Sequence, residues 1–102
     1  MSMSKATEVT TAIRAVWAAV EEITCPVAIT SQHGKQPEVH VLGYRALEQI
    51  PGKTVHKRIG QGRLGLHEMS RELDGIKFYC LLSHLDYNRL VEEHGFDPKG
   101  AE

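Results

Sequence analysis

The segment from Leu66 to Ser83, LHEMSRELDGIKFYCLLS, decides the fold because it admits two interpretations. As a helix, its first half would place Leu66, Met69 and Leu73 at helical spacing. As a β-hairpin, the segment would turn at Asp74-Gly75. This dipeptide favours a type I′ turn, in which both central residues take a positive φ angle. We therefore predict a hairpin, with a helix over the first half as the alternative.

The hairpin also predicts which side chains share a face of the sheet. In its register Glu72 lies opposite Lys77, which makes a favourable cross-strand pair. Alternate residues of a strand point to the same side, so one face collects the apolar side chains of both strands. We expect that face to hold Met69, Leu73, Ile76, Phe78, Cys80 and Leu82.

The chain before this hairpin contains three more short strands and a short helix. Residues 26–31, PVAITS, and 38–42, EVHVL, are typical of strands, and the intervening QHGKQP supplies a glycine and a proline for a turn. A short helix is expected over residues 44–50, closed by Pro51-Gly52. Residues 54–59, TVHKRI, return to strand, with their valine and isoleucine on a common face.

A long N-terminal helix is predicted over residues 5–23. Ser4 is a candidate N-cap, and Pro26 prevents the helix from continuing. Its apolar residues recur at spacings of three and four. They are Val9, Ala12, Ile13, Val16, Trp17, Val20 and Ile23. We interpret this stripe as a core-facing surface; the alternative is a dimer or partner-binding face, because tryptophan is enriched at interface hot spots.

A second helix follows the hairpin, over residues 83–94. Ser83 and Asp86 resemble a capping box, and Gly95 suits the position just after the helix. Its buried side is expected to hold Leu85, Leu90 and Val91. Residues 1–4 and 96–102 are expected to fray. The predicted fold class is therefore α+β, one small domain at 1–102, in which an antiparallel sheet of about 4–5 strands carries the long N-terminal helix and the C-terminal helix on one face.

The composition of the chain is that of a soluble globular protein. It has 102 residues, 41% of them hydrophobic and 25% charged, with a net charge of -1. Global charge therefore favours neither nucleic acid nor an acidic partner, and any basic patch must be local. No apolar run reaches the length of a membrane span, and the N-terminus lacks the pattern of a signal peptide. We expect a cytoplasmic protein without membrane contact.

Three glycines, Gly60, Gly62 and Gly65, spell G-x-G-x-x-G after a predicted strand. In dinucleotide-binding folds this pattern opens a helix whose N-terminus holds the pyrophosphate. Here only a segment of about eight residues could be that helix, and it ends in Asp-Gly. The repeated βαβ units of such folds are also missing. Nucleotide binding is therefore a weaker hypothesis, and no cofactor is expected.

The basic residues of the same segment, 53–63, are the stronger signal. They are Lys53, His56, Lys57, Arg58 and Arg63, with no acidic residue among them. Such a segment suits an acidic protein partner, or a phosphate backbone whose counterions the cations would displace. The simplest interpretation is a solvated strand edge, where lysines discourage aggregation. No aromatic residue is interleaved to stack on bases.

Histidine and cysteine offer candidate chemistry without a recognisable motif. The histidines are His33, His40, His56, His67, His84 and His94. No C-x-x-C or H-E-x-x-H spacing is present, so we expect no metal site. Cys80 and His84 could form half of one if Cys25 lay nearby. The expected state of Cys25 and Cys80 is two reduced, buried thiols, although a disulfide between them is an alternative.

No catalytic constellation stands out. Residues 83–86, SHLD, contain the residue types of a catalytic triad, but helix capping explains the serine and the aspartate more simply. We predict a protein that is not an enzyme: a small protein-binding module, an adaptor or inhibitor of the kind carried by phages and mobile elements. Its partner contacts are expected at Lys53, His56, Lys57, Arg58 and Arg63. Direct nucleic-acid binding and a homodimer that buries Trp17 or a sheet edge are the alternatives.

Overall fold

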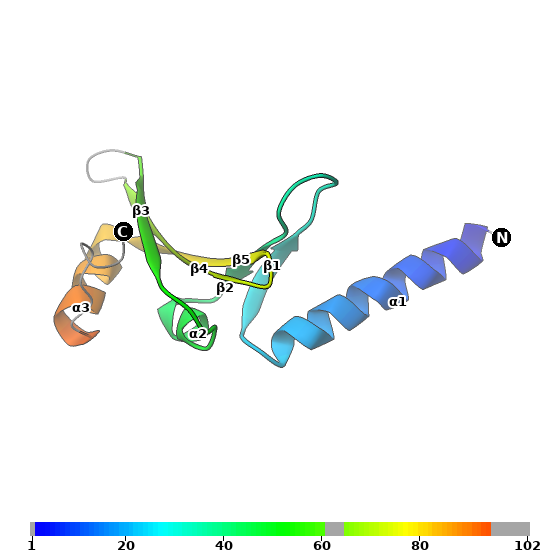
Figure 1. Ribbon diagram of the computed structural model, residues 1–102, viewed down its shortest axis with the longest axis horizontal. Helices are drawn as coiled ribbons and strands as arrows, with labels where there is room; N and C mark the ends of the chain where they lie inside the picture. Colours follow the sequence, from blue (N-terminus) through cyan, green and yellow to red (C-terminus); the bar gives the residue numbers. More distant parts are fainter. Residues whose placement is uncertain (1, 61–64, 95–102) are drawn as a thin grey trace.

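The computed structural model describes residues 2–60 and 65–94, which form one five-stranded sheet and three helices. This confirms the predicted α+β class in a single small domain (Figure 1). In chain order the elements are α1 (Ser2–Glu21), β1 (Pro26–Thr30), β2 (Glu38–Val41), α2 (Tyr44–Glu48), β3 (Val55–Ile59), β4 (Leu66–Leu73), β5 (Ile76–Ser83) and α3 (His84–His94).

The strands lie in the order β1-β2-β5-β4-β3, so β1 and β3 form the two edges of the sheet. Three of the four neighbouring pairs are antiparallel, as predicted, but β2 and β5 run parallel. The reason lies in the connection after β2. The chain passes through α2 to β3 at the far edge, and the β3–β4–β5 meander then returns β5 to the side of β2 in the same direction.

The decisive segment forms the predicted hairpin. Asp74 and Gly75 have φ angles of 50° and 81°, the positive values that a type I′ turn requires. The register pairs Glu72 with Lys77 and Met69 with Cys80, so the predicted cross-strand neighbours are confirmed. The helical alternative for the first half of the segment is therefore wrong.

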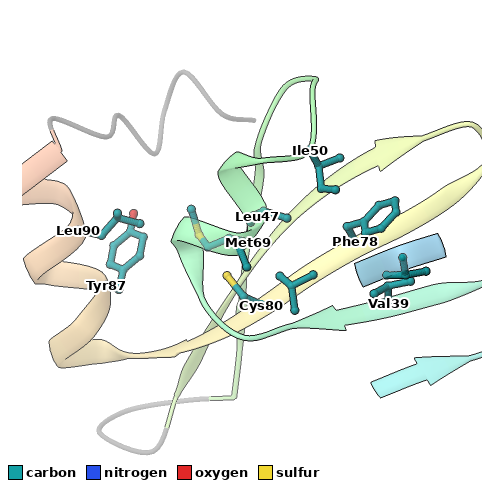
Figure 2. Close-up of a cluster of buried hydrophobic side chains, with 11 residues drawn as sticks. Val39, Leu47, Ile50, Met69, Phe78, Cys80, Tyr87 and Leu90 are labelled. Carbon is teal, nitrogen blue, oxygen red and sulfur yellow. The ribbon is translucent and has the colours of Figure 1, made fainter. Parts of the chain in front are cut away.

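The core lies on one face of this sheet, called here the buried face. Val39 of β2, Met69 of β4 and Phe78 of β5 are almost completely buried there. Leu47 and Ile50 of α2 and the segment after it pack on this face, and Tyr87 and Leu90 of α3 complete one end of the same cluster (Figure 2). Both α2 and α3 therefore cover the buried face.

The opposite side of β3, β4 and β5 is called here the open face. Because side chains alternate along a strand, the register fixes which residues it holds. They are Val55, Lys57, Ile59, Leu66, Glu68, Ser70, Glu72, Lys77, Tyr79 and Leu81. The predicted common face of Val55 and Ile59 is confirmed, but it is this open face, where both side chains are exposed.

The N-terminal helix α1 does not cover the sheet. Figure 1 shows it extending away from the strands, with its N-terminus the most distant part of the chain. Only its last turns meet β1, where Val20 and Thr24 are buried and the Thr24 hydroxyl donates a 2.7 Å hydrogen bond to the Ala46 carbonyl. Val9 and Ile13 are 57% and 54% exposed, so the core-facing interpretation of the apolar stripe is wrong.

The C-terminal helix is capped as predicted but presents a different side to the core. The backbone N–H of Asp86 donates a 3.1 Å hydrogen bond to the Ser83 hydroxyl, which confirms Ser83 as the N-cap. Leu85, expected in the core, is 62% exposed, and Tyr87 is buried in its place. Tyr87 and Leu90 lie one turn apart on the face toward the sheet, and Leu85 lies on the far side. Gly95 and the terminal residues 95–102 lie outside the described residues.

The helix α1 begins at Ser2, before the predicted cap at Ser4. Val27, next to Pro26, sits at a β-bulge in β1 and is exposed, whereas Ile29 packs against the core. None of the helices in residues 2–60 and 65–94 is both long and apolar enough to cross a bilayer.

Arg71 of β4 fastens the connection between α2 and β3 to the sheet. Its Nε donates a 2.8 Å hydrogen bond to the Thr54 hydroxyl, and its Nη1 donates a 2.7 Å bond to the Ile50 carbonyl. A longer bond of 3.4 Å reaches the Glu48 carbonyl. One guanidinium therefore satisfies the end of α2 and the start of β3, which brings β3 to the edge of the sheet.

We expect Arg71→Met to lower the free energy of unfolding by about 2 kcal/mol, because charge-assisted hydrogen bonds to two segments are lost while the volume is kept. Urea unfolding followed by circular dichroism measures the change. The control Arg89→Met removes an exposed arginine of α3, and its effect should stay within about 0.5 kcal/mol. Equal effects of the two substitutions would contradict the anchoring role.

Candidate functional site

The described residues of the predicted basic site lie on two different faces of the sheet, because side chains alternate along the strand that carries most of them. Along β3, Lys57 lies on the open face, whereas His56 and Arg58 point to the other side of the sheet. Lys53 precedes the strand and is exposed, and Arg63 lies outside the described residues. The structure therefore brings Lys53 and Lys57 to one side and separates them from His56 and Arg58.

The position of β3 agrees with the strand-edge interpretation of this segment, because β3 is one of the two edge strands of the sheet. The glycine pattern that follows leads from β3 into the antiparallel strand β4. A dinucleotide site would need a helix at this point, with its N-terminus toward the phosphates. Gly60 has a φ angle of 83°, and Gly62 lies outside the described residues. The glycines of known position thus serve a strand-to-strand connection.

Three of the histidines form a chain beside α3. The Nε2 atom of His56 lies 2.8 Å from Nδ1 of His67, and Nε2 of His67 lies 3.1 Å from Nδ1 of His84. The two pairs of ring centroids are 5.1 Å and 5.3 Å apart. Such separations, with nitrogens in hydrogen-bond contact, belong to rings that meet edge to edge rather than face to face. His56 of β3, His67 of β4 and His84 of α3 are therefore linked by ring hydrogen bonds.

Tyr87 covers this histidine chain from the helix. Its ring centroid lies 4.0 Å from that of His67 with an interplanar angle of 5°, and 4.6 Å from that of His56. These are face-to-face contacts, and they leave His67 only 3% exposed. The arrangement replaces water around a polar ring with two hydrogen bonds and an aromatic surface.

Both nitrogens of His67 have a histidine partner, which restricts the protonation of the chain. A neutral imidazole donates from one nitrogen and accepts at the other. The two hydrogen bonds can therefore point in the same direction along the chain in either of two ways. Burial lowers the pKa of His67 below its ordinary value of 6.5, and the neighbouring His56, His84 and Arg58 lower it further. A neutral His67 and a directional pair of hydrogen bonds follow.

The histidine chain does not provide a metal centre. His67 turns opposite nitrogens toward its two partners, so the three rings do not converge on one point. Among the described residues, no group of three His, Cys, Asp or Glu side chains is placed to hold a metal ion. What the chain does provide is a polar link between two strands and a helix.

Sequence reasoning missed this chain and treated the histidines as scattered. His56, His67 and His84 have no motif spacing, and they meet only through the sheet register. His67 pairs with Arg58, so His56 lies diagonally beside it on the same face of the sheet. The histidine chain could therefore have been predicted from the sequence only with the pairing register of β3 and β4.

The two cysteines differ in environment. Both are free thiols, but Cys25 is exposed, so the expectation of two buried thiols is wrong for this residue. Cys80 is buried, and burial raises its pKa to about 11; the charge of Glu68 adds to this, and a hydrogen bond with the Met69 backbone opposes it. Cys80 is therefore an unreactive core thiol, as predicted.

The open face carries several exposed apolar side chains. Val55, Ile59, Leu66 and Leu81 are between 38% and 49% exposed. Ile59 pairs directly with Leu66, and Leu81 lies diagonally beside Leu66 on the next strand. These four residues are called here the apolar patch. At the start of β3 the patch borders a hollow of about 360 Å³, whose lining includes Lys53, Lys77 and Glu72.

The lowered pKa of His67 predicts an acid-sensitive fold. The unfolded state binds a proton at His67 more readily than the folded state does, so stability from this group is full above pH 6.5 and falls as the pH drops through the folded-state pKa. We expect His67→Gln to lose less stability than the parent between about pH 7 and pH 5. Urea unfolding at a series of pH values measures the slopes.

The control for this measurement is His33→Gln, in the exposed turn between β1 and β2. Its stability should follow the parent curve over the same pH range. Parallel curves for the parent and for His67→Gln would show that the histidine chain does not carry the pH dependence.

Thiol alkylation should separate the two cysteines. At about pH 8 the folded protein should be modified at Cys25 only, because Cys80 is both buried and protonated. Cys80 should react once urea unfolds the chain. Mass spectrometry of iodoacetamide-treated protein gives the positions, and equal labelling rates in the folded state would refute the core assignment.

The described surface thus offers a histidine chain that joins elements, two lysines on one side of the sheet, and an apolar patch beside them. Lys53 and Lys57 are the predicted site residues that lie next to this patch. Comparisons of the chain with protein-family models, with curated proteins and with solved structures found no match.

Proposed function

We propose that this protein is a non-catalytic protein-binding module, an adaptor or inhibitor, that binds an acidic protein surface through its open face. The observation that carries the proposal is the apolar patch of Val55, Ile59, Leu66 and Leu81, exposed beside Lys53 and Lys57. Ile59, Leu66 and Leu81 adjoin one another, and Val55 is set apart from them by Lys57. Exposed apolar surface with polar neighbours is typical of protein interfaces.

The patch is supported by its location on rigid elements. Its four residues come from three hydrogen-bonded strands, and the turn at Asp74-Gly75 fixes two of those strands in register. A surface formed in this way needs little ordering when a partner binds, which reduces the entropic cost of association. Loop residues alone would offer no such advantage.

Charge favours an acidic partner over a basic one. Lys53 and Lys57 are exposed, and residues 53–60 contain no acidic side chain. Lys57 faces Glu68 across the strands, but the Glu68 carboxylate already lies 3.2 Å from the Lys77 ammonium group. The rim of the patch at β3 is therefore positive, and a partner carboxylate can pair with it.

Nucleic acid is supported less well by the same geometry. Lys57 and Arg58 point to opposite sides of the sheet, so one phosphate backbone lying on the open face would meet only the first. The open face also carries the carboxylates of Glu68 and Glu72, whereas protein–DNA interfaces are strongly positive. The two free thiols are consistent with a reducing compartment, and we place the protein in the cytoplasm.

Selection of peptides from a random displayed library tests this proposal without a known partner. We expect the full-length protein to select peptides that combine Asp or Glu with large apolar residues. Fluorescence polarisation should show at least a tenfold loss of affinity in Leu81→Glu, and a similar loss in Lys53→Glu/Lys57→Glu, relative to the parent. The matched control Arg45→Glu/Arg89→Glu changes charges outside the open face and should bind as the parent does.

The same assay with mixed-sequence DNA and RNA at low and physiological salt provides the opposing arm. Peptide binding that is indifferent to the open-face substitutions would overturn the proposal. Tight, steeply salt-dependent nucleic-acid binding that is lost in Lys53→Glu/Lys57→Glu would assign the site to phosphate instead. Circular dichroism of each variant establishes that the fold is retained.

A further inference from the structure

We infer that α1 is a dimerisation helix, and that the occupant of its apolar side is the α1 helix of a second copy of this chain. The apolar residues of α1 alternate at spacings of three and four, the period of a helix that packs along its length on another helix. This seam consists of Ala6, Val9, Ile13, Val16, Val20 and, in the turn that follows, Ile23.

The charged residues of the helix lie away from the seam. Glu8 and Arg14 are more than a quarter turn from Ile13, and Glu22 lies almost opposite it. The helix is therefore amphipathic, with its apolar side exposed along most of its length in a single copy. Apart from Val20, which is buried in the core of its own copy, this seam is a packing surface that one copy of the chain does not use.

Within a single copy, too few packing contacts stabilise such a helix. An isolated helix of this length is marginal in water, because its stability comes mainly from packing of its apolar side. Within residues 2–60 and 65–94, α1 packs mainly through its C-terminal end, on β1. The radius of gyration is 16.1 Å, whereas a compact domain of this size has about 13 Å. The difference reflects the extended helix in Figure 1.

The seam continues into a groove between α1 and the sheet. This groove has a volume of about 370 Å³ and is lined by Ala12, Ile13, Val16, Trp17, Ile29 and Ser31. Trp17 is half-buried and forms one wall, and Ile29 of β1 forms another. An apolar helix entering the groove would contact the seam of α1 and the sheet edge at once.

A two-fold symmetric dimer accounts for both the exposed seam and the groove. The seam is nearly symmetric about Ile13, with Val9 on one side and Val16 on the other. An antiparallel pair centred between residues 12 and 13 places Val9 beside Val16 of the second copy, and the reverse. The N-terminal half of each helix then lies in the groove of the other copy. The exposed N-terminal half and the groove are thereby explained by one contact.

Charge complementarity supports the antiparallel direction. In this arrangement Lys5 of one copy approaches Glu21 of the second, and the symmetry repeats the pair at the other end. Within one copy Lys5 pairs only with Glu8, at 3.4 Å and with both side chains well exposed. A parallel pair would instead bring the two Lys5 side chains together.

The area reaches the lower limit of a specific dimer interface. A helix of 20 residues is about 30 Å long and 10 Å wide, so its contact side presents on the order of 300 Å² before side chains and groove walls are added. Two helices, each also contacting β1 of the other copy, bury on the order of 1,000 Å² in total, the lower limit of specific interfaces. A membrane surface is less suitable, because α1 lacks a basic polar face.

Oligomeric state measured by light scattering and sedimentation velocity tests the inference with the full-length chain. We expect a mass near twice 11.4 kDa for the parent. Ile13→Asp should give a monomer with lower helix content, because its side chain is at the centre of the seam. The matched control Thr11→Asp places the same charge on the far side of α1 and should remain dimeric.

Cysteine cross-linking tests the direction of the helices in a Cys25→Ser background. Val9→Cys and Val16→Cys chains should form a disulfide when mixed but not alone, because identical positions lie about 10 Å apart along this antiparallel pair, beyond disulfide reach. Cross-linking of Val9→Cys with itself would overturn the antiparallel arrangement.

Two further results would overturn the second copy as the occupant. One is a parent that remains monomeric at 100 μM. The other is a monomer that sediments with anionic vesicles in an Ile13-dependent manner, which would assign the seam to a membrane surface. The open face is on a different part of the molecule, so peptide binding there can fail while dimerisation holds, and the reverse.

Discussion

The two-residue turn at Asp74-Gly75 is the constraint on which the other features of the sheet depend. A type I′ turn joins β4 and β5 without spare residues, so it sets Leu73 opposite Ile76 and directs every side chain of both strands. A slip of one residue would carry Met69 to solvent and Glu68 to the core. The strands β2 and β3 pair with this hairpin and adopt its alternation. The buried face, the open face and the position of His67 all follow from it.

Local signals in the sequence were sufficient where local chemistry determines the structure. The Asp-Gly turn and the Ser83 cap require particular residues at particular positions, and both were predicted from those residues. The parallel pairing of β2 with β5 was not, because it depends on a contact between distant segments. The direction of α1 was also missed. An apolar stripe has the same period whether it packs on its own sheet or on another chain, so its period does not identify the surface that covers it.

The candidate site was predictable as a segment but not as a surface. Lys53 and Lys57 were chosen for their charge, and the strand register places them beside apolar side chains that the sequence pattern had assigned only to a common face. The same register sends His56 and Arg58 to the other side, where His56 joins His67 and Tyr87. Successive basic residues of a strand therefore point to opposite faces of the sheet and have different neighbours there. Those neighbours become known only once the pairing partner of the strand is known.

The single parallel pair also has a consequence for the way this chain folds. The sheet consists of two locally connected units, the β1–β2 hairpin and the β3–β4–β5 meander. The parallel pairing of β2 with β5, which sets Val39 beside Phe78, joins the two units. Each unit gains its contacts from residues close in sequence, whereas the pairing of β2 with β5 requires the closure of a long loop that contains α2. We therefore expect the two units to form early and their docking to complete the core late. Leu47 and Ile50 of the intervening segment lie over this junction and hold the finished sheet together.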